Sequence, residues 1–166
     1  MNLLLIRHGL AGKPDANAWP DDELRPLTPK GRKTFKHAAK GLRSLGVAPA
    51  RILASPATRT LETAGILSKA CRLPASALHV LSELHHSRSP SMALSALAKK
   101  RLPRSLALVG HEPWLGEFLS LLIAGDTRAG LEFAKGGAAL VSLDGFAPRA
   151  GRLEWLLTQD QLAALA

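Results

Sequence analysis

The sequence has little of several residue types that mark particular classes of protein. A single cysteine, Cys71, excludes an internal disulfide, and its place in an amphipathic helical pattern predicts that it packs in the core. Aromatic residues make up 4% and tyrosine is missing, so the chain lacks the stacking pattern of a single-strand nucleic-acid binder. No apolar run approaches the roughly 20 residues of a membrane helix, and the first residues do not resemble a signal peptide. These absences predict a soluble, cytoplasmic protein with no membrane partner and with nucleic acid as a disfavoured partner.

What the chain does contain is an ordinary apolar fraction and a strong positive charge. With 166 residues, 46% hydrophobic and 21% charged, it fits one globular domain spanning residues 1–166. The formal net charge of +9 indicates an anionic partner: a phosphorylated ligand, an acidic protein surface or nucleic acid. Part of this charge falls at helical spacing opposite apolar residues, which predicts a solvated outer helix face made of Lys30, Lys33, Lys36, Lys40 and Arg43.

Strand and helix patterns alternate along most of the chain, which is typical of parallel strands joined by crossover helices. The expected strands are 3–6, 51–54, 78–82, 106–109, 138–143 and 152–157, the last two forming a hairpin. The expected helices are 29 to about 46, 57–72, 91–100, 114–124 and 160–165, the first of them capped by Thr28 and Pro29. We therefore expect a three-layer α/β/α sandwich with a mostly parallel sheet and one antiparallel strand.

Three of the expected strands end in polar residues that suit phosphate chemistry. Arg7-His8-Gly9 follows the first strand, Ser55 to Arg59 follows the second, and His111 follows the fourth. Ligands of open α/β sheets bind beyond the carboxyl ends of the strands, so these side chains should meet there. A neutral imidazole can act as a nucleophile, and guanidinium groups can bind phosphate oxygens in pairs. The pattern predicts phosphoryl transfer at this edge, where positioning and charge neutralisation do most of the catalytic work.

These residues resemble the motifs of the histidine phosphatase superfamily, whose fold is called phosphoglycerate mutase-like. The resemblance rests on Arg7-His8-Gly9, on the stretch from Ser55 to Ala64 and on Val109-Gly110-His111, and it spans nearly the whole chain. It implies that His8 takes up the phosphoryl group as phosphohistidine, that Arg7, Arg59 and His111 hold its oxygens, and that water releases phosphate. It implies no metal and no organic cofactor.

The compact length, the segment from Arg25 to Gly31 and the motif from Gly110 to Pro113 resemble the SixA-type phosphohistidine phosphatases within that superfamily. The resemblance implies a phosphohistidine protein, such as a histidine phosphotransfer domain, as substrate. Two alternatives stay open: a phosphatase of small phosphorylated metabolites that uses the same site, and a basic module that binds anions without turnover.

Two further side chains have an open role. Glu83 follows the third expected strand and is a candidate proton donor for the leaving group, although an exposed glutamate there is commonly just solvated. Ser55 is either a phosphate ligand or an N-cap of the next helix. A phosphoramidate leaves more readily than an alkoxide, so an enzyme acting on phosphohistidine needs no strong general acid.

Two further parts of the sequence partly resemble other kinds of site, a metal site and a nucleotide-binding loop. Imidazoles and a carboxylate from His8, His85, His86, His111 and Glu83 could hold zinc. Electrostatics disfavours this, because Arg7 would lie against a dication and no carboxylate that orients a ligating histidine can be identified. We expect no metal, and His85-His86 should line a loop. The stretch from Gly9 to Lys13 is not a Walker loop, because Arg7 stands where that spacing requires glycine and Pro14 stands where Ser or Thr is required.

Overall fold

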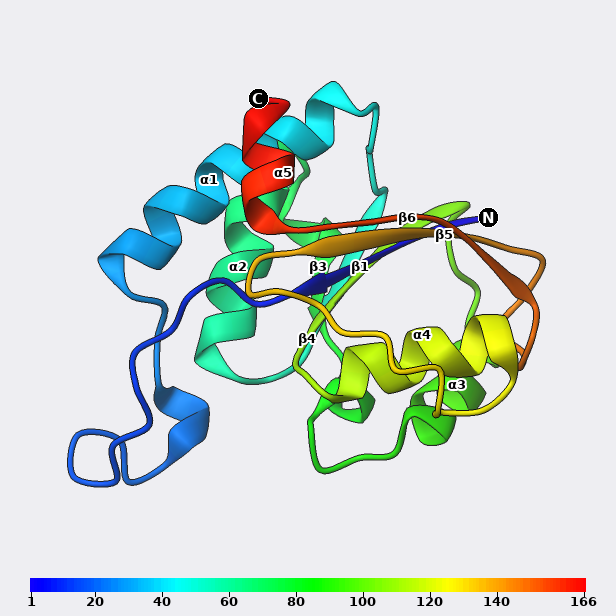
Figure 1. The fold of residues 1–166 in the computed structure, drawn as a ribbon, viewed down its shortest axis with the longest axis horizontal. Coiled ribbons are helices and arrows are strands. Elements are labelled where there is room, and N and C mark those ends of the chain that lie inside the picture. The colour runs from blue at the N-terminus through cyan, green and yellow to red at the C-terminus, as the bar shows by residue number, and fades with distance from the viewer.

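The computed structural model describes all residues of the chain, 1–166 (Figure 1). The strands are β1 (Asn2–Arg7), β2 (Arg51–Ala54), β3 (Leu78–Val80), β4 (Ser105–Gly110), β5 (Ala138–Leu143) and β6 (Gly151–Leu157). The helices are α1 (Pro29–Ser44), α2 (Thr58–Ala70), α3 (Pro90–Ala98), α4 (Trp114–Ala124) and α5 (Gln159–Ala164), with 3-10 turns at Asp22–Leu24, Ala75–Ala77 and Ser82–Leu84. No helix is long and apolar enough to cross a membrane.

All six strands form one sheet with the order β3-β2-β4-β1-β5-β6. Neighbours from β3 to β1 pair in parallel, whereas β5 is antiparallel to both β1 and β6. Only β5 therefore runs against the others, and the expected C-terminal hairpin is its pairing with β6. The predicted fold class, a three-layer sandwich with one reversed strand in a mostly parallel sheet, is confirmed.

The central strands are buried on both faces, which is why they appear in the sequence as uninterrupted apolar runs. In β1, Leu3 and Leu5 belong to a core shared with α3 and α4, and Leu4 and Ile6 belong to a core shared with α1, α2 and α5. Figure 1 shows these two groups of helices on opposite sides of the sheet. Cys71, half-buried directly after α2, packs against the second core, as its helical pattern predicts.

The elements begin and end close to their expected positions, with one informative difference after β3. The third strand stops at Val80 rather than continuing to Ser82. Leu81 still pairs with the Ala54 carbonyl of β2, and the chain then turns so that the His85 N–H donates to the Ser82 carbonyl. Leu81 and Leu84 are both buried, so the turn keeps two apolar side chains in the core that a continued strand would place on opposite faces.

Gly31 fixes how α1 meets the chain segment that follows His8. A Cβ at this position would lie 2.0 Å from the Leu10 carbonyl oxygen, so Gly31→Ala must push the two backbones apart. We expect this substitution to lower the free energy of unfolding by roughly 1–3 kcal/mol, the usual cost of overpacking. Urea denaturation measures the effect.

The matched control is Gly65→Ala in the middle of α2, where an added Cβ would meet nothing within 4 Å. Alanine in a helix interior is more favourable than glycine by roughly 0.5–1 kcal/mol, so this variant should be more stable than the parent. Similar destabilisation by both substitutions would contradict the close approach at Gly31.

Candidate functional site

The strand order brings the predicted residues to one edge of the sheet. β4 lies between β1 and β2, so the carboxyl ends of these three parallel strands are adjacent. Arg7 closes β1 and His8 follows it, Ser55 follows β2, and His111 follows β4. Arg59 joins them from the first turn of α2, which begins at the same edge (Figure 1). The placement expected from the apolar runs is confirmed, whereas the chemical roles of these residues stay predictions.

His8 has one ring nitrogen fixed and the other available. Its Nδ1 lies 2.7 Å from the Gly9 carbonyl oxygen, and because a carbonyl can only accept, Nδ1 carries the proton. Nε2 of the neutral ring then keeps its lone pair. Burial, helped by the positive charges of Arg59 and Arg7, lowers the His8 pKa to about 4 against the raising effect of the Gly9 hydrogen bond. His8 is therefore neutral near pH 7, the state in which Nε2 is a nucleophile.

His111 lies beside His8 and is held by Ser55. The two imidazole rings meet edge to face with centroids 5.4 Å apart. His111 Nε2 lies 2.8 Å from Ser55 Oγ, and burial together with the neighbouring His8 and Arg59 lowers the His111 pKa to about 2. Ser55 is not a helix cap, since Ala57 takes that position and caps α2 without a side-chain bond. The Ser55 hydroxyl instead orients the second imidazole.

Because His8 and His111 are buried and have lowered pKa values, we expect the protein to lose stability in acid. The unfolded imidazole takes up a proton near pH 6.5, whereas the folded pKa is about 4 for His8 and about 2 for His111. The stabilising contribution is therefore fully present above pH 6.5 and is lost as the pH falls from there toward the folded values. Each histidine should lower the free energy of unfolding by roughly 2 kcal/mol between pH 7 and pH 5. Urea unfolding at these two pH values measures the difference.

Substituting one buried histidine separates this effect from general acid sensitivity. In His111→Asn about half of the expected pH-dependent difference should disappear. In His37→Asn, which removes an exposed histidine of α1, the difference should stay as in the parent. The same pH dependence in all three proteins would show that the buried imidazoles do not cause it.

Each of the two arginines of the site has one guanidinium nitrogen, Nη1, hydrogen-bonded to a backbone carbonyl and another, Nε, without a hydrogen-bond partner. Nη1 of Arg7 donates to the Phe133 carbonyl over 2.6 Å, and Nη1 of Arg59 donates to the Asp22 carbonyl over 2.8 Å. The Nε atoms of both guanidinium groups are buried without a hydrogen-bond partner. Buried donors are rarely left unpaired, and two of them close to the neutral imidazoles indicate a place for an anion.

Hydroxyl groups of α2 tie the loop of His8 to the helix that carries Arg59. The Gly9 N–H donates to Thr63 Oγ1 over 3.1 Å, and the Thr63 hydroxyl in turn donates to the Arg59 carbonyl over 2.7 Å. Thr60 Oγ1 lies 2.8 Å from the Ser55 carbonyl. The loop of His8 and the helix that carries Arg59 therefore share one buried hydrogen-bond network, which keeps their relative position fixed.

Glu112 supports Arg7 in a way that no sequence pattern indicated. Its Oε1 accepts from the Phe133 N–H over 3.2 Å, and the Phe133 carbonyl in turn holds Arg7. Burial raises the pKa of Glu112, although the Phe133 N–H and the Arg7 charge counteract this. Glu112 therefore fixes the backbone turn that positions Arg7.

The irregular segment before α1 adds charged groups to the site. Asp22 and Arg25 form a two-fold ion pair with distances of 2.7 and 3.0 Å, and Asp22 Oδ2 lies 3.3 Å from Arg59 Nη1. Arg25 is also close enough to lower the pKa of His8. Only Arg25 stood in a motif that the sequence singled out, because the segment has no periodicity from which contacts can be predicted.

Glu83 is the one predicted residue that the structure does not bring to this group. Its Oε2 accepts from the Ser82 hydroxyl over 3.1 Å. Its side chain lines a surface hollow against α3, together with Ser91, Met92, Ser95, Ala96 and Lys99. None of these residues belongs to the group around His8, so the contacts of Glu83 do not support its predicted role as proton donor.

His85 and His86 do line a loop, but their neighbours differ from those considered in the metal interpretation. Their imidazoles lie near Glu23 rather than near Glu83 or His8. The His86 ring lies 5.7 Å from that of His111, so this loop borders the site. Among histidine, cysteine and acidic residues, only Glu23, His85 and His86 are grouped closely enough to hold a metal ion.

Comparison with known proteins places this geometry in a family. A sequence model of the histidine phosphatase superfamily (branch 1) matches residues 3–118. The chain is 33% identical over 143 residues to an uncharacterized protein of Picosynechococcus sp., covering 82% of each chain. It is 30% identical over 147 residues to the phosphohistidine phosphatase SixA of Escherichia coli, covering 87% of this chain and 86% of the relative.

Solved structures agree with the sequence comparison. A structure of the protein histidine phosphatase SixA complexed with tungstate superposes with a TM-score of 0.82 and 27% identity, covering 98% of this chain and 99% of that one. The α-ribazole phosphatase from Shigella flexneri shares the fold with a TM-score of 0.66 and 17% identity, covering 96% and 97%. The match to the family, over most of the chain and including His8 and Arg59, agrees with the resemblance that the strand-end motifs predict. The chain belongs to branch 1 of the histidine phosphatase superfamily.

Proposed function

We propose that this protein hydrolyses phosphohistidine on another protein, such as a histidine phosphotransfer domain, through a covalent intermediate on His8. The observation that carries the proposal is the neutral His8 imidazole with a free Nε2, close to Arg7 and Arg59, whose Nε–H groups are buried and unpaired. This arrangement offers a nucleophile and a binding place for an anion together. The similarity to SixA, of which one structure contains the tetrahedral oxyanion tungstate, supports the same reaction class.

The first step transfers the phosphoryl group to the enzyme. His8 Nε2 attacks phosphorus, the N–P bond forms, and the bond from phosphorus to the leaving group breaks with its electron pair staying on the leaving group. Arg7 and Arg59 neutralise the charge on the equatorial oxygens, and the neutral His111 ring contributes a hydrogen bond to one of them. The Gly9 carbonyl stabilises the positive His8 ring through the Nδ1–H.

The second step restores the enzyme. Water attacks phosphorus, the N–P bond breaks, and its electron pair returns to Nε2 as inorganic phosphate leaves. The proton balance closes because the substrate ring reacts with its other nitrogen protonated and so leaves as neutral imidazole. In the second step both protons of the attacking water stay on the released phosphate, as H2PO4⁻, and His8 returns to its neutral form. Because the leaving imidazole is a good leaving group, the reaction does not depend on a strong general acid, which fits the location of Glu83 outside the site.

A basic groove beside the site favours a protein over a small molecule as substrate. The groove has a volume of about 620 Å³ and lies between α1 and α2, lined by Arg32, Lys36, Lys40, Arg43, Glu62, Gly65, Ile66, Lys69 and Ala70. On α2 it follows the helix face that begins with Arg59, and at about 1.5 Å per residue Lys69 lies roughly 15 Å farther along the axis. A small metabolite held at His8 would not reach that far, whereas an acidic protein surface would.

Reversing charges in the groove tests whether a protein substrate docks there. We expect Lys36→Glu/Lys40→Glu to lower kcat/KM about 10-fold for a phosphorylated histidine phosphotransfer domain, because lost charge complementarity slows association. Activity toward a generic aryl phosphate should not change. The measurement is phosphate release from both substrates at low ionic strength.

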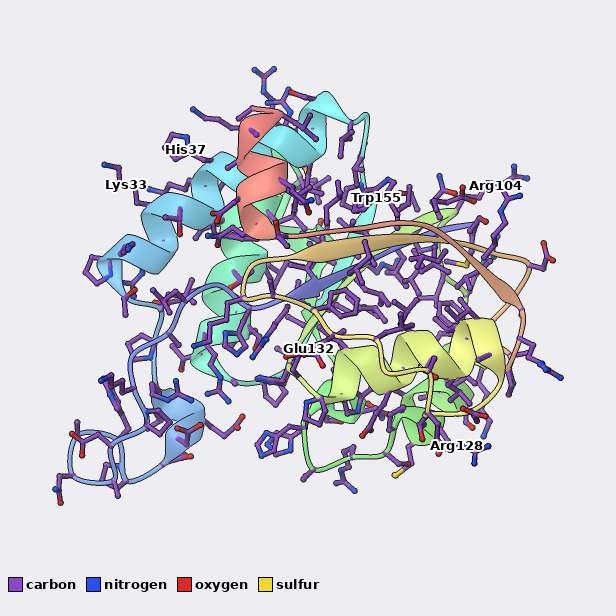
Figure 2. All side chains as sticks on the ribbon, in the orientation of Figure 1. Lys33, His37, Arg104, Arg128, Glu132 and Trp155 are labelled. Atoms are coloured by element: carbon purple, nitrogen blue, oxygen red, sulfur yellow. The ribbon has the colours of Figure 1, made fainter.

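The matched control is Lys30→Glu/Lys33→Glu, which makes the same charge change on α1 outside the groove. Figure 2 shows Lys33 directed away from the sheet. Equal losses in both double variants would contradict docking in the groove. Activity on the aryl phosphate alone would favour a small-molecule phosphomonoesterase, and binding without hydrolysis of either substrate would favour an anion-binding module.

A cytoplasmic location stays a prediction of the sequence.

A further inference from the structure

The loop after β3 and the segment before α1 bring three metal-ligating side chains together. Glu23 comes from the 3-10 turn Asp22–Leu24, and His85 and His86 follow the turn Ser82–Leu84. Their ligand atoms all lie within 4.8 Å of one another. The two imidazole rings lie 4.2 Å apart between centroids, so both face the same carboxylate.

The distances from Glu23 to the two histidines match the spacing of ligands on a tetrahedral metal ion. Glu23 Oε1 lies 3.3 Å from His85 Nε2, 3.5 Å from His86 Nδ1 and 3.9 Å from Arg59 Nη2, an ion-pair contact with Arg59. Both carboxylate oxygens are nevertheless buried without a hydrogen-bond partner. Two ligands bound to zinc at roughly 2.0–2.1 Å in tetrahedral geometry lie about 3.3–3.4 Å apart. A cation between the three side chains would also partner the buried carboxylate, which is otherwise costly to leave unpaired.

Neighbouring contacts hold the histidine loop in this position. His85 Nδ1 lies 2.7 Å from Ser87 Oγ and accepts from the Ser87 N–H over 3.2 Å, so the free ring carries its proton on Nε2. Binding of a metal at Nε2 would move this proton to Nδ1, where the Ser87 hydroxyl oxygen can accept it. The Arg88 carbonyl accepts from Trp114 Nε1 over 2.8 Å, which anchors the loop to α4. These contacts supply the orienting partner that the sequence alone did not reveal.

We propose that Glu23, His85 and His86 bind one zinc ion, with water as the fourth ligand, at the rim of the phosphoryl site. Two imidazoles and a carboxylate select zinc over magnesium or calcium, which prefer oxygen ligands. The centroids of the His86 and His111 rings lie 5.7 Å apart. The ion would therefore lie on the His86 side of His111 and would not contact His8. It joins the segment before α1 to the loop after β3, and thereby restricts the motion of both borders of the site.

Zinc titration without substrate tests the site independently of the phosphatase proposal. Calorimetry should show one ion per chain for the parent, and the affinity should fall at least 100-fold in His85→Ala/His86→Ala, which removes two ligands. The control His37→Ala/His79→Ala removes two exposed histidines from α1 and β3 and should bind as the parent does. Co²⁺ in place of zinc should give the intense visible absorption of four-coordinate cobalt in the parent and the control only.

Two results would overturn the proposal. The first is equal zinc affinity in His85→Ala/His86→Ala and the parent. The second is loss of binding in His8→Ala, which would place the ion at the phosphoryl site instead. Hydrogen exchange provides the readout for the loops: with zinc bound, residues 13–24 and 85–88 should exchange more slowly in the parent and at an unchanged rate in His85→Ala/His86→Ala.

Discussion

Replacing His8 with alanine is expected to lower kcat by roughly 10⁴-fold or more, because removing the covalent nucleophile of an enzyme abolishes its reaction path. The loss should be equal for phosphohistidine protein and aryl phosphate, since both are attacked by the same Nε2. Phosphate release in single-turnover experiments measures it. Substrate binding should persist, because the unpaired Nε–H groups of Arg7 and Arg59 remain.

His37→Ala serves as the matched control, since it removes an exposed imidazole from α1, where Figure 2 shows the side chain directed away from the sheet. This variant should retain the activity of the parent. A His8→Ala protein that folds and still releases phosphate within about tenfold of the parent rate would exclude His8 as the nucleophile.

The second large effect concerns the two arginines. Arg7→Ala and Arg59→Ala should each lower kcat/KM by roughly 10²-fold or more, as does the loss of one donor that stabilises charge in a transition state. Lysine should not restore either activity, because an ammonium group lacks the planar fork that binds two phosphate oxygens. Steady-state kinetics on the aryl phosphate avoids any contribution from protein docking.

Arg104→Ala is the control for the arginines. Arg104 is exposed just before β4, at the opposite end of that strand from His111, and Figure 2 labels it at the edge of the molecule. Its removal should leave kcat/KM unchanged. Losses under threefold in Arg7→Ala and Arg59→Ala would remove these side chains from the mechanism.

The sequence predicts the positions of those site residues that directly follow an apolar strand pattern. The apolar runs before Arg7, Ser55 and His111 mark buried strands, and in a parallel sheet the ends of such strands lie at one edge. The rules for strand and helix patterns therefore suffice to bring these residues together. They suffice for the reversed strand β5 as well, because a loop that contains Gly, Pro and Asp joins it to β6 and predicts a hairpin.

The rest of the site depends on contacts that no local pattern encodes. Ser55 precedes a helix and so suggests a cap, but its partner is His111, 56 residues away in the sequence. Glu23 lies in a segment without periodicity, and only the fold brings it to His85 and His86. Glu83, in contrast, is expected at the site from the strand pattern. The turn that buries Leu81 and Leu84 directs its side chain to α3 instead.

The most direct test of the account is to trap the phosphorylated enzyme and determine which nitrogen carries the phosphoryl group. Rapid mixing with phosphohistidine substrate, an alkaline quench and ³¹P and ¹⁵N NMR of the labelled protein distinguish the two ring positions. Because Nδ1 of His8 is hydrogen-bonded to the Gly9 carbonyl, we expect phosphorylation at Nε2 of His8 and none in His8→Ala. Phosphate on Nδ1, on His111 or on no residue during turnover would contradict it.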